Sequence, residues 1–591
     1  MRRGIGPCPR STALNSGTPQ GGTAVSHPVP ARPEPECLLK GGRVLNLFTG
    51  ELSPANVLLG GGLILGVGEE FREAPSVYEL DGGIVLPGLI DAHLHIESSL
   101  LTPGRLAEAV VPRGTTTVIA DPHEIANVLG LDGVRWMLQA SEGLPLGCLF
   151  MAPSCVPASG LETSGARLGP RAVREMLGWE RVLGLAEVMD FPGVLAGRPD
   201  LVEKISIARQ RGRPVDGHAP RLTGPDLNTY VLAGIESDHE CVTAEEAREK
   251  LRLGMRIMIR QGSQAKNLRA LLPLVDSVSV RRCLLVSDDR NALDLWEQGH
   301  VDHLLREAVA LGLPPLWAVQ MVTLNPAEHF GLRQMGSATP GRRADLVVVN
   351  GLTEFRCERV FKEGRLVAER GKLLAELLPT PPLRRAMSVS PLTRQAFRIP
   401  GRSGWVRVIR LIPDQIETEE LVVEGKVRAG ELVADPERDL AKLVVVERHR
   451  GTGRTGLGLL HGLGLREGAL ASSVAHDSHN LIAAGVDDTD VLMALRQVVE
   501  QGGGLVVASG GGILASLPLP AAGLMSDQPF PETARALRSV NTEAHRLGVR
   551  PAHPFSALSF LALPVIPKLR LTDRGLVDVA RGRIVPLFVE H

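Results

Sequence analysis

Short apolar or β-prone runs alternate with stretches of helical spacing through the middle of the chain. The runs centre on Leu89, Val118, Leu149, Leu183, Val215, Ile235, Ile257 and Leu285. Between them, residues 201–210 and 244–253 repeat apolar positions with the period of a helix. Strands that alternate with helices of this length predict βα units around a parallel sheet. Eight of them predict an α/β fold with a TIM-like (β/α)8 barrel.

Polar side chains follow several of these runs. Residues 86–99, LPGLIDAHLHIESS, carry an apolar run into His93 and His95. Side chains two apart on a strand share a face, so both imidazoles can reach one metal ion, although two neighbouring histidines are as often structural. The polar residues that follow later runs are His123, Glu124, Glu187, His218, His239, Asp288 and Asp289. Because a barrel assembles its active site at the carboxyl ends of its strands, the joint pattern predicts a metal site there.

The predicted barrel, residues 86–332, has a glycine-rich block on each side. Residues 38–85 and 333–377 alternate short β-prone runs with turn residues, and we expect them to form one small composite β-sandwich. A linker with Pro and Arg residues, 378–397, leads to a C-terminal α/β domain, 398–591.

The densest polar cluster outside the barrel is VAHDSHN, residues 474–480, which brings together His476, Asp477 and His479. Either these side chains close over a ligand or bind another ion, or they form a hydrogen-bonded turn between a strand and the following helix. The GGG runs at Gly502 and Gly510 are not followed by Gly-Lys-Ser or Gly-Lys-Thr, so they predict turns and not a phosphate loop.

Composition argues against several classes of protein. Lys+Arg 65 against Asp+Glu 66 gives a formal net charge of -1, which does not favour nucleic acid or an anionic membrane as partner, and we expect a small, nearly neutral substrate. Seven cysteines without paired spacing fit a reduced cytoplasmic protein. No apolar run approaches the ~20 residues that span a bilayer. Residues 1–37, rich in Pro, Gly, Ser and Thr, predict a disordered extension, which a mis-assigned start codon would explain equally well.

The motifs at the strand ends resemble the metal-dependent amidohydrolase superfamily. More narrowly, DAHLHIESS, ADPHEIANV, GLAEVMDFPGV, DGHAPRLTG and MIRQGSQAKNL are similar to the adenine deaminase family of bacterial and archaeal type. The resemblance continues through GALASSVAHDSHN at Gly468 and LPAAGLMSD at Leu519, and it covers nearly everything from Leu38 onward. It implies hydrolytic deamination of adenine to hypoxanthine and ammonia by a cytoplasmic homo-oligomer, a dimer.

Such a reaction needs a strong nucleophile and a proton shuttle, because C6 of adenine is a poor electrophile and ammonia a poor leaving group. A divalent ion lowers the pKa of water towards ~7, so that hydroxide attacks C6, and an adjacent carboxylate moves the protons. By the resemblance, Asp288 is this shuttle and also a metal ligand. The other metal ligands that we expect are His93, His95, His123, Glu187, His218 and His239.

Glu187 would bridge two cations with its two oxygens, which predicts a binuclear centre. The resemblance implies manganese or ferrous iron (Mn²⁺ or Fe²⁺), although mixed imidazole and carboxylate ligands also suit zinc. The residue that protonates the purine ring stays open: Glu124 is one candidate, and a glutamate that merely starts a helix is the alternative. Ser98, Arg260 and Ser263 are expected to read the purine edge, unless Arg260 forms a structural ion pair.

Two other classes of function stay open. The metal ligands alone would also permit another amidohydrolase activity, such as that of a cyclic-amide hydrolase of the dihydropyrimidine type, and release of ammonia against ring opening discriminates between the two. A non-catalytic binding or scaffold protein that retains the fold is the second class. Metal analysis of the purified protein would decide that question.

Overall fold

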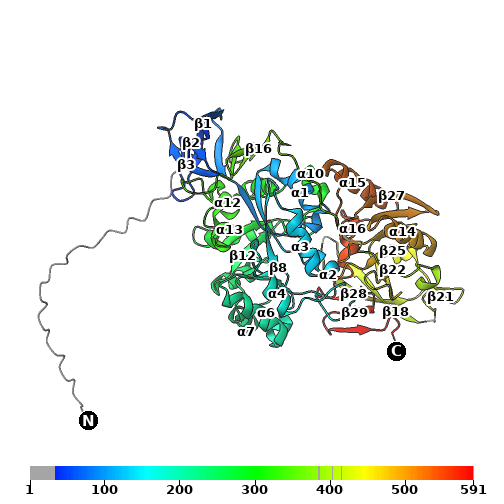
Figure 1. The fold of residues 1–591 in the computed structure, drawn as a ribbon. Coiled ribbons are helices and arrows are strands. Elements are labelled where there is room, and N and C mark those ends of the chain that lie inside the picture. Colours follow the sequence, from blue (N-terminus) through cyan, green and yellow to red (C-terminus); the bar gives the residue numbers. More distant parts are fainter. Residues whose placement is uncertain (1–32, 384–385, 402–403, 414, 590–591) are drawn as a thin grey trace, which may run out of the picture. The chain divides into compact units, whose positions relative to one another are not determined.

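The computed structural model describes residues 33–589, except 384–385, 402–403 and 414. The predicted extension therefore lies outside the described residues apart from its last five positions, and strand β1 begins at Cys37. Figure 1 shows the fold, with labels on many of its helices and strands. Within the described residues, none of the helices combines the length and apolar character needed to cross a membrane.

Eight parallel strands form the barrel at the centre of the chain. They are β6 (Leu89–Leu94), β7 (Thr115–Ala120), β8 (Gly147–Ala152), β9 (Val182–Val188), β10 (Val215–Gly217), β11 (Ser237–Asp238), β12 (Arg256–Arg260) and β13 (Cys283–Val286). They make a five-stranded sheet, β10-β9-β8-β7-β6, and a three-stranded sheet, β11-β12-β13. The two sheets meet at both of their edges. Between β10 and β11, the Glu236 N–H donates to the Val215 carbonyl at 2.9 Å, and between β6 and β13 a parallel bridge joins Leu94 and Asp288. The predicted (β/α)8 barrel is confirmed; only the strand near Ile235 begins two residues later, at Ser237.

Helices follow the strands around the barrel. They are α1 (Pro103–Val110), α2 (His123–Leu129), α3 (Leu131–Ala140), α4 (Pro170–Met176), α5 (Phe191–Leu195), α6 (Pro199–Gln210), α7 (Gly224–Ala233), α8 (Ala244–Arg252), α9 (Leu268–Leu271), α10 (Ala292–Glu297), α11 (Val301–Ala310), α12 (Pro315–Met321) and α13 (Leu324–His329). The two predicted helices correspond to α6 and α8, and α8 begins where the Thr243 side chain accepts a hydrogen bond from the Glu246 N–H.

Strands such as β9 and β13 are mostly apolar and buried along their whole length because both of their faces are covered, whereas β10 and β11 are short and carry polar residues. In β6, Ile90 and Ala92 join an interior cluster with Met151 of β8, and Phe330 packs against the same cluster. The alternate residues of β6, such as Leu89, pack in the larger core that includes the surrounding helices. Such burial on two sides gives a continuous apolar run and not an alternating one.

The two flanks of the barrel meet in one nine-stranded sheet. Its strands are β1 (Cys37–Leu45), β2 (Leu52–Gly60), β3 (Leu63–Gly68), β4 (Ser76–Glu79), β5 (Ile84–Pro87), β14 (Leu346–Val349), β15 (Cys357–Lys362), β16 (Arg365–Glu369) and β17 (Lys372–Leu373). Strands β5 and β14 pair antiparallel and so join the N-terminal flank to the C-terminal one. The buried Lys362 ammonium donates at 2.8 Å to the Thr116 carbonyl of β7 and to Asp345, and this fixes the sheet to the barrel.

The C-terminal region is a second α/β assembly. Its eight-stranded sheet holds β18 (Trp405–Leu411), β19 (Thr418–Glu424), β22 (Leu440–Val446), β23 (Thr455–His461), β24 (Ala469–Ser472), β25 (Leu481–Gly485), β26 (Gly504–Ser509) and β27 (Gly512–Pro518). The remaining elements are β20 (Val427–Arg428), β21 (Glu431–Leu432), β28 (Leu569–Thr572), β29 (Gly575–Asp578), β30 (Arg583–Val585), α14 (Asp488–Glu500), α15 (Phe530–Arg546) and α16 (Pro554–Phe560). Both GGG runs lie at turns, one between α14 and β26 and the other between β26 and β27. The domain limits proposed from the sequence stay a prediction.

Candidate metal centre and active site

Seven of the polar residues predicted from the sequence converge at the carboxyl ends of the barrel strands. His93 and His95 lie at the end of β6, His123 begins α2 after β7, and Glu187 lies in β9. His218, His239 and Asp288 follow β10, β11 and β13. All except His218 are buried, and the His218 side chain is only 12% exposed.

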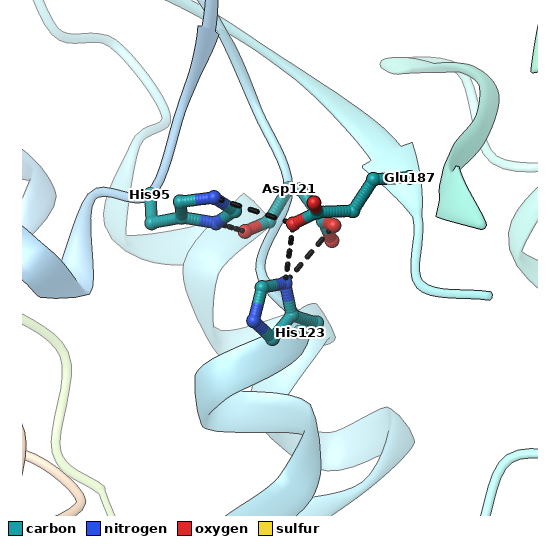
Figure 2. Close-up of side chains that lie close together, drawn as sticks. All are labelled: His95, Asp121, His123 and Glu187. Carbon is teal, nitrogen blue, oxygen red and sulfur yellow. Dashed lines mark hydrogen bonds and ion pairs between the residues drawn. The ribbon is translucent and has the colours of Figure 1, made fainter. Parts of the chain in front are cut away.

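Glu187 lies at the centre of the cluster. Its Oε1 is 3.4 Å from both His95 Nε2 and His123 Nδ1. Its Oε2 is 2.6 Å from His218 Nδ1 and 3.1 Å from His239 Nε2. Figure 2 shows Glu187 with the first of these histidine pairs and Asp121. Each carboxylate oxygen therefore faces its own pair of imidazoles.

Asp288 faces the same space from the opposite strand. Its Oδ1 is 3.6 Å from His93 Nε2 and 3.4 Å from His95 Nε2, and its Oδ2 is 3.1 Å from the Arg260 guanidinium. Burial would raise the pKa of Asp288, but its contacts with the two histidines and the charge of Arg260 outweigh burial and hold the pKa well below its usual range.

The donor atoms of the cluster suit a divalent metal ion. The ligand atoms of His95, Asp121, His123 and Glu187 lie within 4.8 Å of one another, and the same holds for His93 with His95 and Asp288 and for His93 with Glu187 and His239. Nε2 of His93 is buried and has no hydrogen-bond partner among the described residues. Imidazole nitrogens mixed with carboxylate oxygens bind transition-metal dications, so these residues fit the divalent metal ion that the resemblance to the amidohydrolases implies.

Neighbouring groups hold His218, which follows β10. The His218 N–H donates to the Tyr230 hydroxyl at 3.1 Å, and that hydroxyl donates to the Val188 carbonyl at the end of β9. Gly217 precedes His218 because a Cβ at that position would collide with the Ser237 carbonyl of β11. The local sequence thus sets His218 beside Glu187.

Two acids close to the histidines were not singled out from the sequence. Asp121 Oδ2 is 3.0 Å from His123 Nδ1, and the Asp121 carbonyl is 3.0 Å from His95 Nδ1. Glu240 Oε1 is 3.5 Å from His239 Nε2, and Glu240 is paired with Arg260. Both lie within two residues of a chosen histidine, so the strand-end rule applied to every polar side chain would have found them.

The predicted substrate-reading residues have protein partners. Arg260 is buried and paired with Glu240 and Asp288, and its Nε donates to Asn267 at 3.0 Å, which is the ion-pair arrangement considered above as the alternative. Ser263 donates its hydroxyl to Asp294 and lines a neighbouring cavity.

Glu124 and Ser98 are hydrogen-bonded to each other beside the cluster. The Ser98 hydroxyl contacts Glu124 Oε1 at 2.9 Å and Asp289 Oδ1 at 2.5 Å. His476 Nδ1 is 3.2 Å from the same oxygen of Glu124. Burial, and then the charge of Glu97, raises the pKa of Glu124 well above its usual range.

The C-terminal region forms one wall of the cavity over the cluster. This cavity, with about 490 Å³ of empty space, is lined on that side by Ile416, His476, Asp477, Phe560, Leu563 and Ile566. His479 is instead held within the turn, where its Nδ1 accepts the Ala475 N–H at 3.2 Å. The VAHDSHN segment is thus a turn, but it joins strands β24 and β25 and does not lead directly into a helix as predicted. Binding of a ligand or another ion by His476, Asp477 and His479 stays a prediction.

Comparisons with known proteins agree with this architecture. Residues 84–367 match the model of the Amidohydrolase family, and residues 415–583 match that of the Adenine deaminase C-terminal domain. The barrel with its strand-end cluster is thus of the amidohydrolase class.

Whole-chain relatives narrow this class. An adenine deaminase of Desulfatibacillum aliphaticivorans is 48% identical over 554 residues, which cover 94% of this chain and 97% of that protein. Adenine deaminase 2 of Carboxydothermus hydrogenoformans is 47% identical over 93% of this chain and 97% of its own length. An adenine deaminase of Methanothrix thermoacetophila is 46% identical over 94% of this chain and 98% of its own length. The chain belongs to the adenine deaminase family.

Proposed function

We propose that this protein is a hydrolytic adenine deaminase that converts adenine and water to hypoxanthine and ammonia at a binuclear manganese or ferrous iron centre. The observation that carries the proposal is the position of Glu187, whose two oxygens face separate histidine pairs. The chain that holds this glutamate belongs to the adenine deaminase family. The relatives favour this activity over a cyclic-amide hydrolase.

The metal would be held by His93, His95, His123, Glu187, His218, His239 and Asp288. A divalent cation bound there lowers the pKa of water towards ~7, which supplies a nucleophile at neutral pH. Glu187 contributes a charge that both positions share, because its two oxygens point in different directions.

Asp288 takes the proton of the nucleophile in this proposal and delivers protons to the departing nitrogen. Its Oδ1 faces His93 and His95, two of the residues that would hold the metal, while Arg260 holds Oδ2 at 3.1 Å. Arg260 accordingly orients the shuttle and does not read the purine. The exocyclic nitrogen leaves as ammonia once it has been protonated.

Glu124 is the proposed proton donor to the purine ring. Its Oε1 is held by the Ser98 hydroxyl and faces His476, whereas its buried Oε2 has no hydrogen-bond partner among the described residues. Glu124 also lines the cavity over the cluster. Ser98 acts through Glu124 in this arrangement, and Ser263 would contact only a group that extends into the neighbouring cavity.

We further propose that the protein works in the cytoplasm as a homodimer on the free base and without nucleic acid, as the family resemblance implies. The near-zero formal charge of -1 supports the absence of nucleic acid, and the absence of paired cysteine spacing supports the cytoplasmic location.

The test is direct. The protein is purified from cells grown with added manganese, its metal content is measured, and adenine is supplied. Conversion to hypoxanthine with one ammonia per adenine, at about two metal ions per chain, is the expected result. A dihydropyrimidine is the control substrate. Ring opening of this control without deamination of adenine would refute the proposal.

A further inference from the structure

Asp477 lines the cavity from the turn between β24 and β25, and one of its carboxylate oxygens is unpaired. The residue is buried and lines the cavity over the cluster. Its Oδ1 is 3.7 Å from both His123 Nε2 and His476 Nδ1. Its Oδ2 is buried and has no hydrogen-bond partner among the described residues. An unpaired oxygen of this kind is costly unless a ligand donates to it.

The position of Asp477 fits the far edge of a purine. The His123 ring lies between the two carboxylates, with Nδ1 3.4 Å from Glu187 Oε1 and Nε2 3.7 Å from Asp477 Oδ1. The carboxylates of Glu187 and Asp477 therefore lie on opposite sides of the His123 ring, each in contact with one of its nitrogens. A purine whose C6 lies at the cluster spans a comparable length to an acceptor beyond its five-membered ring.

The cavity wall around Asp477 suits a flat heterocycle. Phe560, Leu563 and Ile566 supply apolar surface on the same side. Phe560 is stacked on His476, with ring centroids 4.6 Å apart and planes 14° apart, which fixes the orientation of both rings.

The other carboxylates that line the cavity are engaged elsewhere. Glu240 and Asp288 are paired with Arg260, and Asp289 accepts the Ser98 hydroxyl. Glu124 already carries the ring proton in the proposed function. Among the carboxylates that line the cavity, only Glu124 and Asp477 have a buried oxygen without a hydrogen-bond partner in the described part of the chain, which leaves Asp477 to accept a hydrogen bond from the substrate.

Resting on the proposed function, we propose that Asp477 accepts the N–H of the five-membered ring of adenine and so selects the free base over bases substituted at N9. Free adenine carries one N–H on that ring, at N9 or N7. A base substituted at N9 has no donor there, and it presents a lone pair and a substituent to a buried carboxylate. A site built around such a hydrogen bond rejects an analogue without the donor by about 10⁴-fold.

The test compares wild type, Asp477→Asn and Ser478→Ala, all purified with manganese. Ser478 is a matched control because it is buried in the same turn, where its hydroxyl accepts the Asn480 side-chain amide at 3.2 Å, and it is not among the residues that line the cavity. Metal per chain and kcat/KM for adenine and 9-methyladenine are measured. Wild type and Ser478→Ala should prefer adenine by about 10³-fold or more.

In Asp477→Asn the metal content should stay at the wild-type value while kcat/KM for adenine falls about 100-fold or more. The preference for adenine over 9-methyladenine should then drop to about 10-fold or less, because the amide no longer penalises the missing donor. Calorimetry of wild type with hypoxanthine and 9-methylhypoxanthine tests the same discrimination without any substitution, should the variant fail to fold.

Three results would overturn the inference. Loss of metal in Asp477→Asn would make Asp477 a positioning residue that acts through His123. An unchanged preference with both substrates slowed equally would make it structural. Equal binding of the two hypoxanthines by wild type would remove the discrimination itself. Failure of the proposed function itself gives a different result: wild type that carries metal but does not deaminate adenine.

Discussion

Replacement of Glu187 by glutamine tests the binuclear centre, because it changes the charge and one oxygen while it keeps the shape of the side chain. Glu187 Oε1 contacts His95 and His123, and Oε2 contacts His218 and His239. In the amide, one of these oxygens becomes an NH₂ group that cannot ligate a cation. One histidine pair therefore loses its shared anionic ligand, and the negative charge that Glu187 would offer to the two cations is lost.

We expect wild type to hold about two metal ions per chain and Glu187→Gln to hold one or fewer. If the bridge supplies one charge-assisted ligand to each ion at the transition state, activity should fall by at least about 100-fold, which corresponds to roughly 2.7 kcal/mol. The assay is elemental analysis of both proteins after growth in manganese, together with the rate of adenine deamination. Circular dichroism checks that the fold survives.

Glu162→Gln serves as the matched control for this variant. Glu162 is also a buried glutamate, and it follows β8 in the loop before α4, but it is not among the residues that line the cavity over the cluster. Its replacement should leave two ions per chain. A Glu187→Gln protein that keeps two ions and full activity would refute the bridging role, as would wild type that is fully active when saturated with one ion.

Three further predictions concern single residues. His93→Ala or His95→Ala should abolish deamination and lower the metal content, since both rings face Asp288 at 3.4–3.6 Å; unchanged metal and rate in both variants would remove the proposed site. Asp288→Asn should lose at least about 100-fold in kcat while circular dichroism stays that of the wild type, because an amide cannot accept the nucleophile's proton; near-normal turnover would assign the shuttle to another residue. Burial, and then the charge of Asp477, raises the pKa of Glu162 from 4.5 to about 8, so the folded state keeps a proton that the unfolded state releases, and stability falls as pH rises between these values. Between pH 5 and 9 the wild type should lose on the order of a few kcal/mol of its free energy of unfolding, and Glu162→Gln should not show this loss, as measured from urea midpoints. Identical dependence of the unfolding free energy on pH in variant and wild type would contradict this.

The barrel could be predicted from the sequence because its determinants are local. Strands such as β9 and β13 are short, mostly apolar runs that are buried, and polar residues lie at their carboxyl ends. His93, Glu187 and Asp288 were found by this rule, which depends only on neighbours in the chain. The short strand β11, with two residues, was placed near Ile235 because so brief an element has almost no pattern of its own.

The wall of the cavity could not be predicted in the same way. Asp477 and His123 lie 3.7 Å apart but more than half the length of the chain separates them, so no local pattern relates them. The partner of Arg260 had the same difficulty, because Glu240 comes from a different strand end. Contacts of this kind depend on how whole elements pack and not on the period of any one of them.

The covering of the cavity by the C-terminal region has a consequence for the order in which the protein becomes active. The last barrel strand ends at Val286, whereas the residues that cover the cluster begin at Ile416 and extend to Ile566. The ribosome therefore completes the histidine ligands well before it makes their cover. A base can be enclosed over the cluster only after the segment from Ile416 to Ile566 has been made and has folded against the barrel.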